Sequence, residues 1–569
     1  MNNLELQNAL QIINFTHRSL FLTGKAGTGK STFLRYIANT TKKKHIILAP
    51  TGIAAINAGG ATLHSFFKLP FYPLLPDDIK FSPRNIRNTL KYNAEKIKLI
   101  KEVELIIIDE ISMVRSDIID FIDKVLRIYC RNMREPFGGK QMLFVGDIYQ
   151  LEPVLKEDEW KILQPYYPSK YFFDAKIFRT FQLISIELKK VYRQSDPLFI
   201  DILDHIRTSN ITKGDLNVLN GRVGKELDNE DSSLAITLST RRDTVDYINN
   251  EKLKLIDEEP TMFYGIINGE FPQSSLPTPI ELELKLGAQI LFVKNDIKKR
   301  WVNGTLGTVI GLDSADDGFI LVRTENGDDV EVEQEIWSNV KYTYNSKEKK
   351  IEEDEIGTYR QFPLRLAWAI TVHKSQGLTF TRVKIDFTGG VFAGGQAYVA
   401  LSRCTSMEGI SLKEPIRWED IFIRKEVVNF AKGYNDDNIL NTALKQSKAD
   451  KQYHDTVKAF DTGNMQAALD NFFLAIHSRY DIEKPSVIRY IRKKLNIINE
   501  LKKQNDILTE NIKKRDKFLK KLAVEYVLMG KECEAAHMKD AAIKNYQKAL
   551  ELYPSITEAK KKLDKLMNE

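Results

Sequence analysis

The chain has 569 residues, of which 43% are hydrophobic, and its formal net charge is +7. This length accommodates about three to five domains with cores of their own, and this composition excludes a largely disordered chain. No run of 18 apolar residues occurs, and the amino terminus lacks a basic flank before an apolar stretch, so we expect neither a membrane span nor a secretory signal. Three widely spaced cysteines form no metal or disulfide pattern, which is typical of a cytoplasmic protein.

The first predicted element is a helix over residues 4–15, where apolar residues recur at helical spacing. Gln7 lies among them and could hold an adenine edge, although a lone glutamine on such a helix is more often solvated.

Residues 20–38 predict a buried strand, a glycine-rich loop and a helix, in the pattern G-x-x-x-x-G-K-[ST] that cradles phosphates. The glycines allow positive φ angles that turn backbone N–H groups toward an anion, and the start of the helix adds its positive dipole end. Lys30 would neutralise the β- and γ-phosphates of ATP, and Ser31 would offer a hydroxyl to Mg²⁺. The candidate nucleotide-binding residues are Gln7, Gly24, Gly27, Thr28, Gly29, Lys30, Ser31 and Thr32.

A second strand over residues 45–51 leads into a segment of small residues and short hydroxyl donors, which suit close approach to nucleic-acid phosphates. Phe66 would stack on a base if its ring faces the nucleic acid. Packing at a helix end is the alternative for His64 and Phe66, and the sequence leaves it open. The candidate nucleic-acid contacts here are Thr51, Gly52, Thr62, His64, Ser65 and Phe66.

Residues 67–101 predict a small excursion from the sheet, after which VELIIIDEIS returns to it. This strand ends in two carboxylates at the edge where α/β sheets bind ligands. Asp109 would hold Mg²⁺ through water, and Glu110 would orient and deprotonate an attacking water. The strand in QMLFVGDIYQ repeats the arrangement with Asp147 and Gln150 at its end, and Gln150 would contact the γ-phosphate or water.

Strand and helix patterns alternate again from residue 171 to 255 without a second glycine loop, which predicts a second α/β unit. Arg193 and Arg403 lie beside polar turns of this half, so both are candidates to neutralise transition-state charge; a surface ion pair is the alternative for an isolated arginine.

From residue 288 short alternating strands with Asn-Gly turns predict a small inserted β-barrel. The α/β pattern then resumes, and a polar turn follows its buried strand. This turn would grip the phosphates of a single strand, or it is only a loop. Its candidate residues are Thr371, His373, Lys374 and Gln376.

Together these motifs resemble the PIF family of superfamily 1, class B DNA helicases. The resemblance covers residues 1 to about 415 and rests on Gln7 and on GKAGTGKS, APTGIAAINAGGATLHSFF, IIIDEIS, GDIYQLEPV, VYRQ, KNDIKKRWVNGTLGTV, AWAITVHKSQGLTF and AYVALSRCTS. It implies an enzyme that hydrolyses ATP with Mg²⁺, moves 5′ to 3′ on single-stranded DNA and unwinds duplex junctions in repair, recombination or replication. The candidate catalytic residues are Lys30, Asp109, Glu110, Gln150, Arg193 and Arg403, and Ser31 and Asp109 are the candidate metal ligands.

The implied fold is α/β, with two tandem RecA-like lobes, a Src-homology-like β-barrel inserted in the second lobe, and an all-α carboxyl-terminal domain. We expect the first lobe at residues 1–165, and the second at 166–296 and 363–432 around a barrel at 297–362. A linker at 433–448 and a tetratricopeptide-like domain at 449–569 complete the prediction.

Two features depart from the family pattern. Glu152 stands where the family usually has proline, which would place a carboxylate near the DNA path. In the tail, residues 467–476 and 541–550 match at seven positions that are all offset by 74 residues, near two tetratricopeptide periods of about 34. The match indicates helical repeats that could bind a protein partner, with an unrelated amphipathic bundle as the alternative.

Residues 484–521 carry 13 Lys and Arg against 4 Asp and Glu, whereas residues 1–430 are formally neutral. Apolar residues recur there every three to four positions, so we expect an amphipathic helix with one buried side and one basic side. The basic side would hold nucleic acid, or would only keep a helical repeat soluble. The apolar residues are Ile488, Ile491, Leu495, Ile498, Leu501, Ile507 and Leu508.

A rival to the helicase is a nucleotide-gated DNA-binding scaffold whose tail recruits a partner protein. The two differ in whether ATP hydrolysis separates a duplex. RNA and hybrid duplexes stay open as substrates, because loops that grip a backbone do not identify the sugar clearly.

Overall fold

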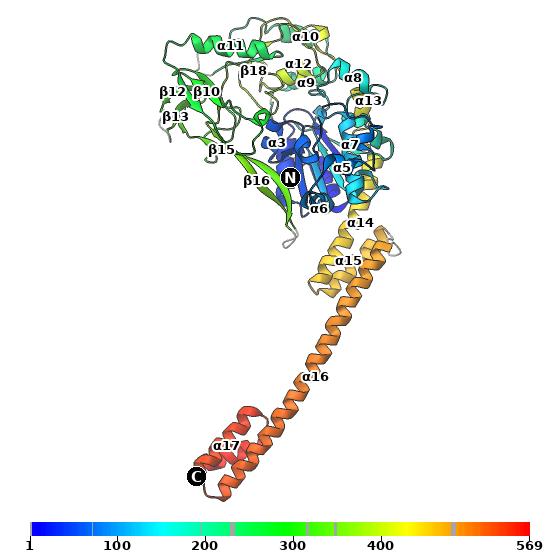
Figure 1. Cartoon of the computed structure of the whole chain (residues 1–569), viewed down its shortest axis with the longest axis vertical. Helices are drawn as coiled ribbons and strands as arrows, with labels where there is room; N and C mark the ends of the chain where they lie inside the picture. Colours follow the sequence, from blue (N-terminus) through cyan, green and yellow to red (C-terminus); the bar gives the residue numbers. More distant parts are fainter. Residues whose placement is uncertain are drawn as a thin grey trace. The chain divides into compact units, whose positions relative to one another are not determined.

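The computed structural model describes residues 3–70, 72–194, 196–227, 234–313, 318–345, 350–479 and 485–568 (Figure 1). The chain forms two compact units, residues 1–471 and 472–569. None of the helices in these described ranges combines the length and the hydropathy needed to span a membrane.

The first lobe is built on a six-stranded parallel sheet with the strand order β3-β2-β4-β5-β1-β6. Its strands are β1 (Leu20–Gly24), β2 (His45–Ala49), β3 (Ala61–Thr62), β4 (Leu105–Ile108), β5 (Gln141–Val145) and β6 (Ile184–Leu188). Its main helices are α1 (Leu4–Phe15), α2 (Lys30–Thr40), α3 (Gly52–Ala58), α4 (Leu63–Phe67) and α7 (Ser116–Cys130).

Both faces of this sheet are buried, which explains why its strands are near-continuous apolar runs. Ile106 of β4 packs with α7 on one face, and its neighbour Ile107 packs with α1 and α2 on the other. The strand ends that carry the predicted carboxylates therefore meet at one edge of the sheet.

The expected end of the first lobe at residue 165 is wrong, because β6 pairs in parallel with β1 along its whole length. The expected linker at 433–448 is also wrong. The backbone N–H of Asn435 donates to the carbonyl of Ser185 (2.9 Å), and α14 (Asp437–Asp461) buries Ala443 in the same core as α1. The local sequence pattern of β6 would equally suit a strand of the second lobe, and that of α14 would suit a connecting helix. Only their long-range contacts assign the two segments to the first lobe.

The region 67–101 leaves the sheet between β3 and β4, as predicted, and it also packs into the first lobe's core. It forms a single turn η1 (Ile79–Phe81) and the helices α5 (Ile86–Leu90) and α6 (Ala94–Glu102). Phe81, Leu90 and Leu99 are buried in the cluster that contains the sheet face under α7.

The second lobe contains a four-stranded parallel sheet with the order β18-β7-β19-β20, as the alternating pattern predicts. Its strands are β7 (Ile236–Ser239), β18 (Ala369–Thr371), β19 (Val383–Asp386) and β20 (Ile410–Leu412). Its helices are α9 (Pro197–Arg207), α10 (Lys213–Asn220), α11 (Arg242–Lys254) and α12 (Gln396–Leu401). The helix α13 (Lys425–Ala431), which was expected in this lobe, instead buries Val427 in the core of the first lobe.

The insertion in this lobe is antiparallel, but it is wider than the expected 297–362. A five-stranded sheet runs β14-β13-β12-β11-β17, a pair joins β10 to β8, and a three-stranded sheet runs β15-β16-β9. The bounds are β8 (Thr261–Tyr264), β9 (Ile266–Gly269), β10 (Glu281–Leu284), β11 (Gln289–Phe292), β12 (Leu306–Leu312), β13 (Ile320–Thr324), β14 (Asp329–Val332), β15 (Glu335–Asn345), β16 (Lys350–Gln361) and β17 (Leu364–Leu366). That these strands form a Src-homology-like barrel stays a prediction.

The long β15–β16 ribbon touches the first lobe. The backbone N–H of Ile47 in β2 donates to the hydroxyl of Tyr342 (3.3 Å), and burial raises the pKa of that hydroxyl. The insertion is therefore tied to the lobe that carries the glycine loop.

The carboxyl-terminal unit contains α16 (Pro485–Ala535), α17 (Lys539–Leu552) and α18 (Thr557–Asn568), and α15 (Met465–Ser478) precedes them. Figure 1 shows α17 alongside the carboxyl-terminal end of α16, where Ala523 and Val527 pack against Tyr546. The buried side expected for residues 484–521 is wrong: Leu501 and Leu508 are each 59% exposed. A tetratricopeptide fold for these helices stays a prediction.

Candidate active site

The glycine-rich loop joins β1 to α2 and closes around its own lysine. Gly24, Gly27 and Gly29 have φ angles of +152°, +78° and +86°, values that side chains rarely adopt. The Lys30 ammonium donates to the carbonyls of Gly24 (2.6 Å) and Lys25 (3.0 Å), and burial lowers its pKa. A Cβ on Gly27 would lie 2.4 Å from the Cβ of Arg193, so the loop needs glycine to admit this arginine.

A cavity of about 470 Å³ opens over this loop at the junction of the two lobes. The first lobe contributes the loop and the ends of β4 and β5, and the second contributes two arginines. The structure thus brings the candidate catalytic residues into one cavity. Its lining includes Lys30, Ser31, Thr32, Asp109, Glu110, Asp147, Gln150, Tyr192, Arg193 and Arg403.

The two carboxylates after β4 lie in a half-buried, strained turn. Glu110 has a φ angle of +50°, and its backbone N–H donates to the Asp109 carboxylate (2.9 Å). Burial raises the pKa of Asp109, and burial followed by the charge of Asp109 raises the pKa of Glu110 to about 7. A carboxylate with a pKa near neutral is suited to accept a proton from water.

The arginines of the second lobe reach this cavity from two segments. Arg403 is 1% exposed, and its guanidinium donates to the carbonyls of Val399 (2.9 Å) and Leu378 (3.3 Å). Arg193 donates to the carbonyl of Ser402 (3.3 Å). Burial, and then the positive charge of Arg193, lower the pKa of Arg403 to about 9. Such a shift is expected where two cations lie close together in a buried site.

Two further residues of the second lobe, neither of them predicted from the sequence, contact the side of the cavity formed by the glycine-rich loop. Arg207 of α9 forms a buried ion pair with Asp147 (3.1 Å) and a second with Glu187 (2.9 Å). The backbone N–H of Ala26 donates to the hydroxyl of Tyr398 (2.9 Å). The one available signal was the charged face of α9, which also brings Asp204 to Lys25.

A second cavity of about 470 Å³ adjoins the first and combines part of both predicted nucleic-acid segments. Thr51 of the first lobe lines it together with His373, Lys374 and Gln376 of the turn after β18. Gln376 also reaches the nucleotide side, because its amide donates to Glu110 (2.7 Å) and to Gln150 (3.2 Å). Thr371 instead caps the turn: its hydroxyl accepts from the backbone N–H of Lys374 (3.3 Å).

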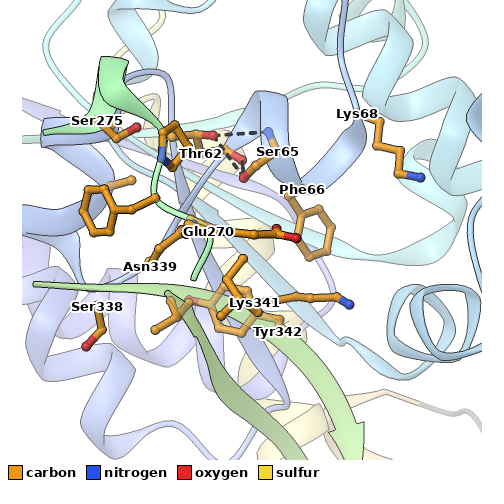
Figure 2. Close-up of a pocket in the computed structure, with 18 of the residues that line it drawn as sticks. Thr62, Ser65, Phe66, Lys68, Glu270, Ser275, Ser338, Asn339, Lys341 and Tyr342 are labelled. Carbon is orange, nitrogen blue, oxygen red and sulfur yellow. Dashed lines mark hydrogen bonds between the residues drawn. The ribbon is translucent and has the colours of Figure 1, made fainter. Parts of the chain in front are cut away.

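The remaining first-lobe candidates other than His64 lie at a different cavity, of about 630 Å³, between α4 and the β15–β16 ribbon. Figure 2 shows Thr62 and Ser65 there, joined by the hydrogen bond from the Ser65 backbone N–H to the Thr62 hydroxyl (3.1 Å) that caps α4. Gly52 lines the same cavity, where a Cβ would lie 2.4 Å from the Ser275 hydroxyl.

Phe66 also lines this cavity, but its ring is buried and not open to a base in this arrangement, so base stacking stays a prediction. Its side chain is 3% exposed and packs edge-on against Phe67 (ring centroids 4.9 Å apart). The helix-end packing that the sequence left open is the one observed. His64 lines neither cavity, and burial lowers its pKa.

The chain is similar to known proteins over most of its length. The model of the PIF1-like helicase family matches residues 6–226. The chain is 32% identical to the ATP-dependent DNA helicase Pif1 of Bdellovibrio bacteriovorus over 440 residues, 76% of this chain and 91% of that protein. The chain belongs to the PIF1-like helicase family.

Comparison with other members of the family shows how much of the chain the similarity covers. The human ATP-dependent DNA helicase PIF1 is 33% identical over 404 residues, 69% of this chain, and the chain spans 58% of the human protein's length. A crystal structure of Bacteroides sp. Pif1 with ADP-AlF4 is 40% identical, with a TM-score of 0.69 over 76% of this chain and 96% of that one. Bacteroides Pif1 bound to single-stranded DNA has 40% identity and a TM-score of 0.56, over 77% and 98% of the two chains.

Two candidate residues lie at the margin of this site. Gln7 is exposed on α1 and does not line the nucleotide cavity, so its contact with adenine stays a prediction. The Glu152 carboxylate is 6% exposed and pairs with Lys170 (2.8 Å), while the hydroxyl of Tyr171 donates to it (3.0 Å). Its charge is thus compensated inside the first lobe, although it lines a cavity that His373 shares.

Proposed function

We propose that this chain is an ATP-dependent DNA helicase that moves 5′ to 3′ on single-stranded DNA. One observation carries the proposal: a single amide, that of Gln376, touches both Glu110 and Gln150 from a turn that also carries His373 and Lys374. A displacement of this turn on DNA binding would therefore also displace the groups that would activate water.

On the nucleotide side, different residues would neutralise phosphate charge and transfer a proton. Lys30 and the loop N–H groups would bind the phosphates, and Glu110 would accept the proton of the attacking water. Arg193 and Arg403 would neutralise charge that develops on the γ-phosphoryl group, which requires the second lobe to be closed on the first.

Mg²⁺ fits the same cavity. In the part of the chain that the structure describes, no cluster of three or more His, Cys, Asp or Glu side chains could hold a metal. Ser31 and Asp109 both line the nucleotide cavity, and Mg²⁺ is usually held by one or two protein oxygens together with phosphates and water. Bound there, Mg²⁺ would neutralise phosphate charge.

The DNA side is a backbone-gripping surface. Thr51, His373 and Lys374 line one cavity from two lobes, and the hydroxyls of Thr62 and Ser65 lie at the start of α4 beside another. Binding should be tolerant of sequence and sensitive to salt, because such contacts go to phosphates.

The proposal is tested by strand separation with 5′-tailed, 3′-tailed and hybrid duplexes. We expect ATP-dependent unwinding of the 5′-tailed DNA only. Lys30→Ala should abolish ATP turnover, and Glu110→Gln should bind ATP without hydrolysing it. Lys42→Ala, which changes an exposed lysine just beyond α2, is the matched control and should behave as the parent.

Two outcomes would contradict the proposal. Preference for the 3′ tail would reverse the assigned polarity. DNA-stimulated hydrolysis without separation of any duplex would favour the scaffold, in which ATP only gates DNA binding and the tail recruits a protein.

A further inference from the structure

We propose that α16 binds a second copy of this chain through a parallel, two-stranded coiled coil over residues 494–522. The proposal concerns the helical unit alone and does not depend on the helicase activity.

The sequence of α16 follows a heptad repeat without interruption for about four heptads. Positions a and d, three and four residues apart in alternation, are the ones that meet in a coiled coil. Leu and Ile fill most of them, and the polar exceptions are one Asn and two long cations. The a positions are Ile498, Asn505, Ile512 and Leu519, and the d positions are Lys494, Leu501, Leu508, Arg515 and Leu522.

The middle of this seam has no cover within its own unit. Ile498, Leu501, Leu508 and Ile512 are 37%, 59%, 59% and 52% exposed. The packing with α17 and α18 is confined to the carboxyl-terminal end of α16, where Ala523 is fully buried. A helix of 51 residues owes its stability in water to packing of its apolar face, so a stripe of exposed Leu and Ile requires a partner.

The composition of the seam indicates which partner. Ile at a with Leu at d favours two parallel strands, and a single Asn at an a position fixes register and oligomeric state. In a parallel pair Asn505 would face Asn505 of the second copy, so that each amide finds a hydrogen-bond partner. An antiparallel pair would place Asn505 against a leucine and leave its amide unsatisfied.

The charges of α16 agree with this orientation of the helix. Most of its lysines, including Lys503, Lys513 and Lys517, occupy the outer positions b, c and f and would stay in water. Arg515 lies at a d position next to Asp516 at e, and in a parallel pair these two groups lie near each other across the seam. The basic face and the apolar seam are therefore separate surfaces of one helix.

The full chain, freed of nucleic acid by nuclease and salt, should be measured by analytical ultracentrifugation. We expect twice the chain mass of 65.4 kDa. The double variant Leu501→Asp, Leu508→Asp should sediment as a single chain, since it places charges in the seam. Ile507→Asp is the matched control: Ile507 is 50% exposed but lies at the outer position c, so this variant should remain a dimer.

Orientation is tested by cross-linking under mild oxidation, with the parent as the baseline for its own three cysteines. Asn505→Cys should give a covalent dimer, because the two copies of residue 505 meet only in a parallel pair, and Ile507→Cys should give none beyond the baseline. A monomeric parent at every concentration, or a dimer that survives the seam variant, would overturn the proposal. A dimer without the cross-link at 505 would overturn its parallel register.

Discussion

At the scale of single residues, Gln376 has the most consequential position, because one side-chain NH₂ serves two acceptors on the other lobe. Its donation to Glu110 favours the charged carboxylate, whereas burial and the charge of Asp109 raise the pKa of that group. Loss of this amide should therefore weaken the response of hydrolysis to DNA more than the binding of either ligand.

We expect Gln376→Ala to reduce DNA-stimulated ATP turnover about tenfold, the equivalent of one hydrogen bond worth about 1.4 kcal/mol, while DNA affinity changes little. Lys374→Ala, two residues earlier on the same turn, should do the reverse and weaken DNA binding first. The measurements are ATPase rates with and without single-stranded DNA, together with DNA titrations. Equal losses in both variants would contradict the division of roles.

Removal of Arg193 and removal of Arg403 should have different effects on the stability of the fold. Arg193→Ala and Arg403→Ala should each cut turnover about 10³-fold with nucleotide affinity nearly unchanged, since such groups act on the transition state. Arg403→Ala should also lower the melting temperature, because its buried guanidinium serves the carbonyls of Val399 and Leu378. Arg242→Ala, an exposed arginine of α11, is the control, and parental rates in either cavity variant would make that arginine structural.

At the scale of elements, α9 is the main tie between the second lobe and the nucleotide loop. Arg207 is 4% exposed and holds Asp147 and Glu187, and Asp204 on the same helix pairs with Lys25 of the loop. A buried carboxylate without its ion-pair partner destabilises a fold by more than the ion pair stabilises it. Removal of Arg207 should therefore lower the free energy of unfolding substantially.

Arg207→Met, which keeps most of the side-chain volume, should lower the free energy of unfolding by about 3 to 5 kcal/mol, because the buried Asp147 loses its ion-pair partner. Urea denaturation of the two proteins measures this. The double variant Arg207→Met, Asp147→Asn should recover part of the loss, and no recovery would show that the arginine matters for packing alone.

The elements also show how far the sequence alone could predict this fold. The glycine loop, the parallel strands and their polar ends follow from local pattern, and the structure brings Lys30, Glu110 and Arg403 to one cavity. The assignment of β6 and α14 to the first lobe could not be predicted, because it depends on pairing between segments more than 100 residues apart. The burial of Phe66 could not be predicted for a related reason: an aromatic residue at a helix end has the same sequence signature whether it is buried or binds a base.

At the scale of the whole chain, the expected start of the tail at residue 433 needs revision. The hydroxyl of Ser447 in α14 accepts from the amide of Gln11 (2.9 Å), and Arg18 donates to Gln446 (3.4 Å). Residues up to the end of α14 therefore complete the first lobe by covering α1, and the separable tail starts only after that helix.

Two truncations test this revised boundary. A chain that ends after residue 430 should lose thermal stability and ATP turnover, because α1 loses its cover and β6 loses the contacts of Asn435. A chain that ends after Gly463 keeps every one of these contacts, so its DNA-stimulated ATPase should match that of the full chain. It lacks a segment with 22 Lys and Arg against 15 Asp and Glu, so its affinity for long DNA should fall at moderate salt. Loss of ATPase in the longer chain would place the boundary beyond α14, and full activity in the shorter one would make α14 dispensable to the first lobe.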